Sequence, residues 1–167
     1  RNQTLAIIHY EKLISLEPKK IPLENLNDIL SKKIIAGLKK YGFSGLLPFQ
    51  EESIRSILKG NNSIISAPTG SGKTEAFIIP ILQKILENPI KGVFVLLVYP
   101  LNALIDDQVS KISELIEKCQ LNNIISTYSI HGGQSSQYKD KIITESYKKS
   151  IILATNFDFI NYHLILQ

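Results

Sequence analysis

The feature that most constrains this chain is a glycine-rich segment of eight residues, Ala67-Pro68-Thr69-Gly70-Ser71-Gly72-Lys73-Thr74. An apolar run precedes it at 63–66, and an apolar run of helical character follows it at 76–79. Such a loop between a strand and a helix brings several backbone N–H groups to one point, where the positive end of the helix dipole also lies. The segment therefore predicts a phosphate site, in which Lys73 reaches the β- and γ-phosphates and the Thr74 hydroxyl ligates Mg²⁺. The alternative is a flexible turn between two core elements.

Composition places the chain among globular proteins of about one domain. It has 167 residues, of which 44% are hydrophobic and 20% are charged. The single cysteine, Cys119, cannot form an intramolecular disulfide, which fits a reducing compartment, and we expect it to pack at a helix end. No apolar run reaches the length of a membrane span, and nothing at the start resembles a signal peptide. We therefore expect a cytoplasmic protein without a membrane partner, and the absence of an initiator methionine before Arg1 suggests a fragment.

Net charge is +4, and the basic excess lies before the glycine-rich segment. Residues 1–60 carry ten Lys and Arg against six Asp and Glu, whereas residues 61–167 carry nine of each. Three lysine pairs, at 19–20, 32–33 and 39–40, could contact nucleic-acid phosphates. The alternative, which we favour, is that they are the solvated faces of helices.

The spacing of apolar residues predicts strands that alternate with helices. Expected strands are 63–66, 93–99, 124–130 and 150–154, and expected helices are 4–16, 23–29, 31–41, 48–58, 73–87, 102–119, 139–144 and a last one from residue 157. Within these, Ser31 is expected to cap a helix, Pro48 to open one, and Pro80 to lie inside one and kink it. This order predicts an α/β fold with a parallel sheet and helices on both faces. We divide the chain into a short helical N-terminal segment, 1–40, and a domain, 41–167.

Further segments accompany the glycine-rich loop. Tyr41-Gly42-Phe43 and Leu47-Pro48-Phe49-Gln50 precede it, with Gln50 standing 23 residues before Lys73. Residues 98–108, with the sequence VYPLNALIDDQ, His131-Gly132-Gly133, and Ala154-Thr155-Asn156-Phe157-Asp158 follow it in that order. Over residues 41–167 the chain thus resembles the first RecA-like domain of superfamily-2 helicases of the DEAD/DEAH type.

The resemblance implies a nucleotide-binding role for Gln50. An amide donates and accepts at once, which matches the N6/N7 edge of adenine. In the family an aromatic residue that stacks on the base often stands about 17 residues earlier, where this chain has Lys33, so Tyr41 or Phe43 could take that place. Without its context, Gln50 reads as a surface residue at a helix start.

The same resemblance implies nucleic-acid contacts at Pro100, Leu101 and Asn102 (motif Ia), Gly132 and Gly133 (motif Ib), and Thr155 and Asn156 (motif Ic). Backbone N–H groups at helix N-termini would hold the phosphates. Motif Ia departs from the P-T-R-E-L-A form of DEAD-box RNA helicases and is closer to the RecQ-like and Lhr-like DNA helicases, which favours DNA over RNA. The alternatives are two helix caps and a plain turn.

The resemblance implies an ATP-dependent helicase or translocase that uses ATP and Mg²⁺ and acts on single-stranded or partly duplex nucleic acid. A second RecA-like domain and a D-E-x-[DH] box are expected outside residues 1–167, so we expect this stretch alone to hydrolyse ATP poorly. Members of the RecQ and Lhr type serve in DNA repair or phage defence. Other hypotheses are a DEAD-box-like RNA remodeller and a nucleotide-dependent switch that recruits proteins.

Overall fold

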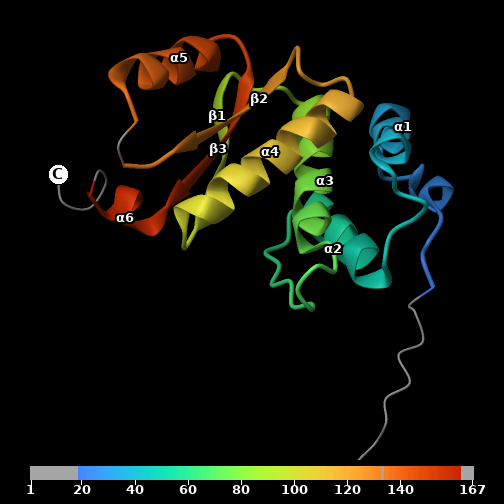
Figure 1. The fold of residues 1–167 in the computed structure, drawn as a ribbon. Coiled ribbons are helices and arrows are strands. Elements are labelled where there is room, and N and C mark those ends of the chain that lie inside the picture. The colour runs from blue at the N-terminus through green and yellow to red at the C-terminus, as the bar shows by residue number, and fades with distance from the viewer. Residues whose placement is uncertain (1–18, 133, 163–167) are drawn as a thin grey trace, which may run out of the picture.

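The computed structural model describes residues 19–132 and 134–162 (Figure 1). In chain order its elements are η1 (Leu23–Leu26), α1 (Lys32–Tyr41), α2 (Pro48–Leu58), α3 (Lys73–Glu87), β1 (Gly92–Tyr99), α4 (Asn102–Lys118), β2 (Ile125–Ile130), α5 (Ser136–Ser146), β3 (Ser150–Asn156) and α6 (Phe157–Ile160). The expected helix at 4–16 lies outside the described residues. Most of the other expected elements are confirmed to within a few residues.

The three strands form one parallel sheet in the order β1-β3-β2. The central strand, β3, is buried along most of its length. The continuous apolar run at 93–99 predicts a strand covered on both faces, but β1 lies at the edge of the sheet and none of its residues is fully buried. Figure 1 shows α4 and α5 on opposite sides of this sheet, and both helices contact all three strands. The predicted α/β fold with a parallel sheet and helices on both faces is therefore confirmed. Because the strands are parallel, their carboxyl ends lie at one edge, where the expected motifs Ia, Ib and Ic begin.

The strand expected at 63–66 does not form. Residues 61–68 are irregular, and β1 pairs only with β3, so the outer edge of β1 has no partner among the described residues. An extended segment becomes a strand only when a neighbour accepts its backbone hydrogen bonds, and none lies beside this one. The Ile64 side chain is consequently fully exposed. A cleft of about 530 Å³ separates this segment from β1, with Ile65, Phe77 and Leu96 in its walls.

The helices before the glycine-rich loop end where local chemistry dictates. The Ser31 hydroxyl accepts a hydrogen bond from the Ile34 N–H at 3.3 Å and so caps α1, as predicted. Gly42 ends that helix with a left-handed φ of 109°. Pro48 opens α2 as expected. Helix α3 continues as one element through Pro80, which is buried.

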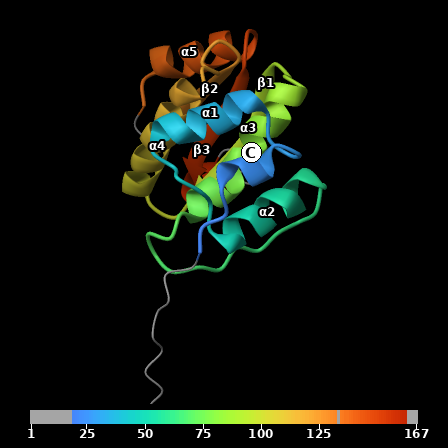
Figure 2. The same cartoon turned by 90° about the vertical axis from the view of Figure 1, so that its right-hand side faces the viewer.

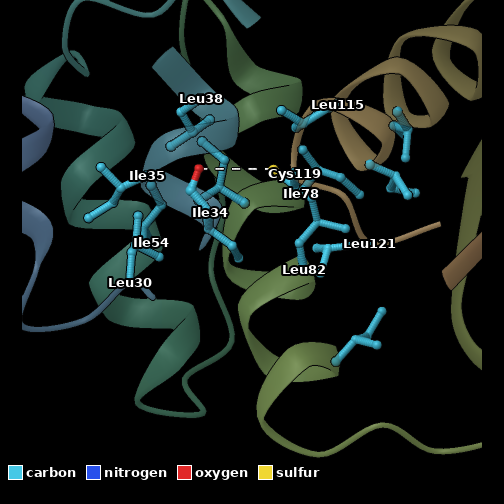
Figure 3. Close-up of a cluster of buried hydrophobic side chains, with 14 of the residues drawn as sticks. Leu30, Ile34, Ile35, Leu38, Ile54, Ile78, Leu82, Leu115, Cys119 and Leu121 are labelled. Atoms are coloured by element: carbon cyan, nitrogen blue, oxygen red, sulfur yellow. Dashed lines mark hydrogen bonds between the residues drawn. The ribbon is translucent and has the colours of Figure 1, made fainter. Parts of the chain in front are cut away.

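Helix α1 packs tightly across α4, as Figure 2 shows from the side. A Cβ atom built on Gly37 would lie 2.2 Å from the Cys119 Sγ, so only glycine allows this approach. Cys119 is buried at the end of α4, as predicted, and its thiol points to the Ile34 carbonyl at 3.9 Å (Figure 3). Burial raises the pKa of the Cys119 thiol to about 11. The side chains that share this core come from η1, α1, α2, α3, α4, β2 and β3, so residues 23–38 pack into the same core as the expected domain.

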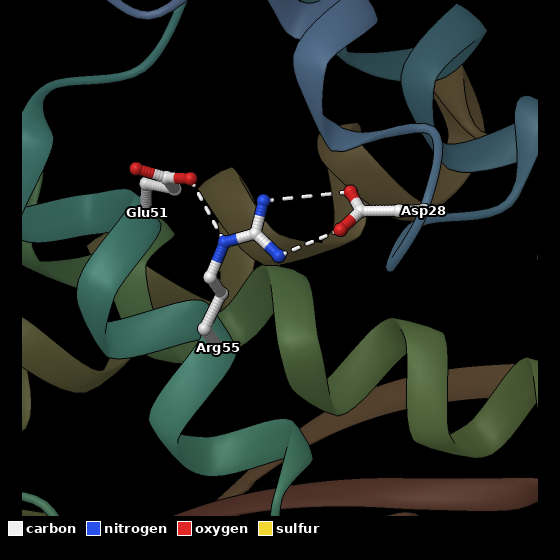
Figure 4. A network of polar contacts seen from close by, with 3 residues as sticks. All are labelled: Asp28, Glu51 and Arg55. Atoms are coloured by element: carbon white, nitrogen blue, oxygen red, sulfur yellow. Dashed lines mark hydrogen bonds and ion pairs between the residues drawn. The ribbon is translucent and has the colours of Figure 1, made fainter.

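An arginine joins the N-terminal segment to α2 (Figure 4). The Arg55 Nη1 lies 2.8 Å from the Asp28 Oδ2, and its Nε lies 2.8 Å from the Glu51 Oε1. The hydrogen bond from Arg55 lowers the pKa of Asp28. The planar guanidinium can hold two carboxylates at once, and it thereby ties α2 to the segment before α1 that contains Asp28.

Candidate functional site

The glycine-rich loop forms a turn that ends at the start of α3. Gly70 and Gly72 have φ values of 77° and 86°, in the left-handed region that side chains disfavour. The Ser71 hydroxyl donates to the Pro68 carbonyl at 2.7 Å, and its N–H donates to the same oxygen at 3.3 Å, which closes the turn. Gly72 is the N-cap of α3, so the first N–H groups of that helix lack partners within it. The loop therefore presents unpaired donors beside a positive helix end.

Lys73 lies inside this turn. Its Nζ donates to the Ala67 carbonyl at 2.6 Å and to the Pro68 carbonyl at 2.8 Å. The loop thus holds the ammonium group at its own centre, close to the unpaired donors. A phosphate oxygen arriving there would meet a cation and several backbone N–H groups together.

Gln50 touches the loop directly. Its Oε1 accepts from the Leu47 N–H at 2.8 Å, and its Nε2 donates to the Gly72 carbonyl at 2.9 Å. The side chain is only 3% exposed. Gln50 therefore joins the start of α2 to the turn before α3, and its role in reading adenine stays a prediction.

A cleft of about 780 Å³ opens beside the loop. Its walls include Thr69, Gly70, Gly72, Lys73 and Thr74 from the loop and Tyr41, Tyr99 and Gln108 from three other elements. Tyr41 stacks on Phe43 with ring centroids 5.8 Å apart, and of the two only Tyr41 lines the cleft. Of the two expected stacking partners, Tyr41 is thus the one placed beside the loop.

Two polar side chains at the cleft were not among the expected site residues. The Thr74 hydroxyl donates to the Gln108 Oε1 at 2.8 Å, which connects α3 to α4. The Tyr99 hydroxyl is buried and has no hydrogen-bond partner among the described residues, and burial raises its pKa. The sequence placed Gln108 in motif Ia, but only the fold brings it to Thr74.

The other expected site residues gather at the carboxyl edge of the sheet. Asn102 begins α4, and its Oδ1 accepts from the Asn156 Nδ2 at 2.6 Å. Pro100 and Leu101 precede it, and the Leu101 side chain is 62% exposed. The structure therefore brings motif Ia and motif Ic together in one surface.

Motif Ib reaches the same surface. The His131 Nε2 lies 3.7 Å from the Asp106 Oδ1 of α4, and Gly132 is exposed after it. Gln134 holds the turn, since its Oε1 accepts from the His131 N–H at 3.1 Å. Gly133, also expected to bind nucleic acid, lies outside the described residues.

Thr155 and Asn156 are buried, whereas Asn102 is exposed. Thr155 is 1% exposed, and its hydroxyl has no hydrogen-bond partner among the described residues. The Asn156 side chain accepts from the Phe159 N–H at 2.6 Å and caps α6. A phosphate would thus reach the backbone at this strand end more readily than the Thr155 hydroxyl.

The N-terminal lysines are partly engaged. Lys39 forms an ion pair with Glu24, and the Lys20 Nζ lies 3.5 Å from the Ser44 Oγ.

Within residues 19–132 and 134–162 no group of three His, Cys, Asp or Glu side chains could hold a metal ion. No helix in that part of the chain is long and apolar enough to cross a membrane.

Comparison with known proteins adds to this geometry. A model of the DEAD/DEAH box helicase family matches residues 47–166. The ATP-dependent RNA helicase ROK1 of Kluyveromyces lactis is 30% identical over 154 residues, which cover 87% of this chain and 26% of that protein. The uncharacterized ATP-dependent helicase YprA of Bacillus subtilis is 27% identical over 87% of this chain and 18% of its own length.

Solved structures give the same picture. The helicase MrfA, solved with DNA and AMPPNP, matches 89% of this chain and 19% of its own with a TM-score of 0.74 and 27% identity. Mss116p, solved with single-stranded RNA and AMP-PNP, matches 82% of this chain and 28% of its own with a TM-score of 0.71 and 26% identity. The chain thus spans about a quarter or less of the curated relatives ROK1 and YprA.

Proposed function

Because this chain belongs to the DEAD/DEAH box helicase family and is its first RecA-like domain, we propose that it is the ATP-binding motor domain of a helicase or translocase. The observation that carries the proposal is the turn at 67–74, where unpaired backbone donors, the Lys73 ammonium and the start of α3 meet beside an open cleft. In this proposal Lys73 contacts the β- and γ-phosphates, and the loop from Pro68 to Gly72 holds them through its backbone.

The donor set fits a magnesium ion that is held mainly by the nucleotide. Mg²⁺ prefers oxygen ligands and keeps several waters, so a P-loop site needs few protein ligands. The Thr74 hydroxyl donates its hydrogen bond to the Gln108 amide oxygen and keeps its lone pairs available, as a metal ligand requires. Bound there, the ion would neutralise charge on the phosphates.

For the base, we propose that Gln50 and Tyr41 act together. Gln50 already fixes the turn through the Gly72 carbonyl, and its second amide N–H and second lone pair remain for adenine. Tyr41 lines the cleft beside the loop, whereas Gln50 is 3% exposed and does not line it, so contact with the base requires the Gln50 amide to become accessible. A purine would thereby gain both an edge contact and a stacking contact.

The nucleic acid would lie across the carboxyl edge of the sheet, over Asn102, Gly132 and the end of β3. We propose DNA as the preferred strand, because motif Ia has the P-x-N-A-L-x-x-D-Q form and MrfA was solved with DNA. ATP binding would close this domain on a second RecA-like domain, and hydrolysis would reopen it, which moves the strand. We propose a cytoplasmic role in DNA repair or phage defence.

The test is the ATPase rate of the full-length protein with single-stranded DNA or with RNA of matched sequence. Lys73→Ala is expected to abolish turnover, whereas Lys59→Ala, at an exposed site, should leave it unchanged. Stronger stimulation by RNA would replace DNA in the proposal with an RNA remodeller, for which the RNA helicase ROK1 is a precedent. ATP affinity that is indifferent to both strands would instead favour a nucleotide-dependent switch that recruits proteins.

A further inference from the structure

We propose that Gln108 is a positioning residue for the nucleotide site: its amide oxygen accepts the hydrogen bond from the Thr74 hydroxyl and so leaves both lone pairs of the hydroxyl oxygen free for Mg²⁺. The inference rests on the proposed function and adds a residue from α4 to a site otherwise built by the loop and α3. The contact that suggests it joins the Thr74 Oγ1 to the Gln108 Oε1 at 2.8 Å, across the wall of the cleft.

The orientation of the Gln108 amide decides whether this contact helps or hinders a metal. A threonine hydroxyl has one proton and two lone pairs. If the amide oxygen faces Thr74, the hydroxyl donates its hydrogen bond to that oxygen, and both lone pairs of the Thr74 Oγ1 stay free. If the amide nitrogen faced Thr74, it would occupy a lone pair and turn the proton towards the cleft, where it would oppose a cation.

Asp107 selects the useful orientation. The Gln108 Nε2 donates to the Asp107 Oδ2 at 3.2 Å, and only the nitrogen end of an amide can face a carboxylate favourably. Lys111 donates to the same Oδ2 at 2.7 Å, so the carboxylate is itself held in place. The hydrogen bonds from Lys111 and Gln108 therefore converge on the Asp107 carboxylate, and the Thr74 hydroxyl donates in turn to the Gln108 amide oxygen.

This chain of contacts contributes little to folding. Asp107 and Lys111 are more than half exposed, and exposed ion pairs add little stability. A purely structural tie between α3 and α4 would act equally with and without a metal. The positioning role predicts instead an effect seen only when Mg²⁺ is present.

The experiment measures the affinity of the full-length protein for a fluorescent, non-hydrolysable ATP analogue, with excess Mg²⁺ and with EDTA. The ratio of the two dissociation constants gives the benefit of Mg²⁺. Gln108→Leu removes the acceptor and is expected to lower this benefit about five-fold, the size of one hydrogen bond, with the affinity in EDTA unchanged. Gln108→Glu keeps an acceptor for the Thr74 proton and is expected to retain most of the benefit.

Four further variants complete the test. Asp107→Asn should lower the benefit less than Gln108→Leu, because the amide loses only its orienting partner. Thr74→Val should remove the benefit, and adding Gln108→Leu to it should then change nothing more. Ser110→Ala, exposed on the same helix, is the matched control and should behave as the parent protein.

The outcomes distinguish a failure of the positioning role of Gln108 from a failure of the proposed ATP-binding function. An equal Mg²⁺ benefit in the parent and in Gln108→Leu, or a Gln108→Leu effect that persists in EDTA or beside Thr74→Val, overturns the positioning role and leaves the proposed function intact. A parent protein that binds the analogue without any Mg²⁺ benefit does the same. A parent protein that binds no analogue at all overturns the proposed function as well.

Discussion

Replacing Gly72 with alanine tests whether the phosphate loop and Gln50 act as one unit. Gly72 has a φ of 86°, and a non-glycine residue held there costs about 1–2 kcal/mol. A Cβ atom at Gly72 would also lie 2.3 Å from the Gln50 Nε2, so the buried amide must move away. Moving it loses the hydrogen bonds to the Leu47 N–H and the Gly72 carbonyl, at about 1 kcal/mol each. We expect Gly72→Ala to destabilise the chain by about 3–4 kcal/mol in all.

Gly70 provides the matched control, because its φ is 77° and a Cβ atom there would meet nothing within 4 Å. Gly70→Ala should therefore cost only the backbone strain, about 1–2 kcal/mol. In a Gln50→Ala background the additional cost of Gly72→Ala should fall to the same value, because no amide remains to be displaced. The free energy of unfolding in urea, followed by circular dichroism on residues 1–167, measures all four variants. Equal costs for the two glycine substitutions, or a Gly72→Ala cost unchanged without Gln50, would refute the reasoning.

Three other predictions concern the packing that supports the loop. Gly37→Ala should destabilise by about 1–2 kcal/mol in urea unfolding, since overpacking against Cys119 outweighs the gain in helix propensity; a more stable variant would contradict the clash. Cys119, with its pKa raised to about 11, should react slowly with iodoacetamide at pH 8.5. The free energy of unfolding should fall from about pH 9 to 11, because in that range only the thiol of the unfolded chain ionises. Rapid labelling of the folded chain would argue against the burial of Cys119. Because Arg55 lowers the pKa of Asp28, Arg55→Gln should lower the midpoint of urea unfolding at pH 7. The difference in midpoint between the parent and the variant should shrink as the pH falls below the ordinary pKa of an aspartate. A difference that does not change with pH would exclude the Arg55–Asp28 ion pair as its cause.

Much of the fold followed from periodicity and capping residues. The Ser31 cap and the start of α2 at Pro48 rest on local chemistry, which a sequence displays directly. The apolar strand at 93–99 also forms, but none of its residues is fully buried, because it lies at the edge of the sheet. The strand at 63–66 had the same apolar pattern and did not form, because a strand needs a neighbour and the pattern does not say which segment supplies it. Pairing is a property of the sheet and cannot be read from one segment.

The candidate site divides in the same way. The turn from Gly70 to Lys73 is local, so its left-handed glycines and its helix start could be expected from the letters alone. Gln108 lies 34 residues from Thr74, and only the crossing of α3 and α4 brings them within 2.8 Å. The burial of the Thr155 hydroxyl likewise depends on neighbouring strands and could not be foreseen.

The irregular stretch before the phosphate turn has a thermodynamic consequence. With no ladder to hold residues 61–66, the turn is anchored firmly on its α3 side and loosely on the other. Part of the binding free energy of a nucleotide then goes into ordering residues 61–66, and the affinity is lower by the same amount. A strand or ligand that pairs with the outer edge of β1 would order residues 61–66 before the nucleotide binds. The affinity for the nucleotide should therefore be higher when that edge is paired than when it is not.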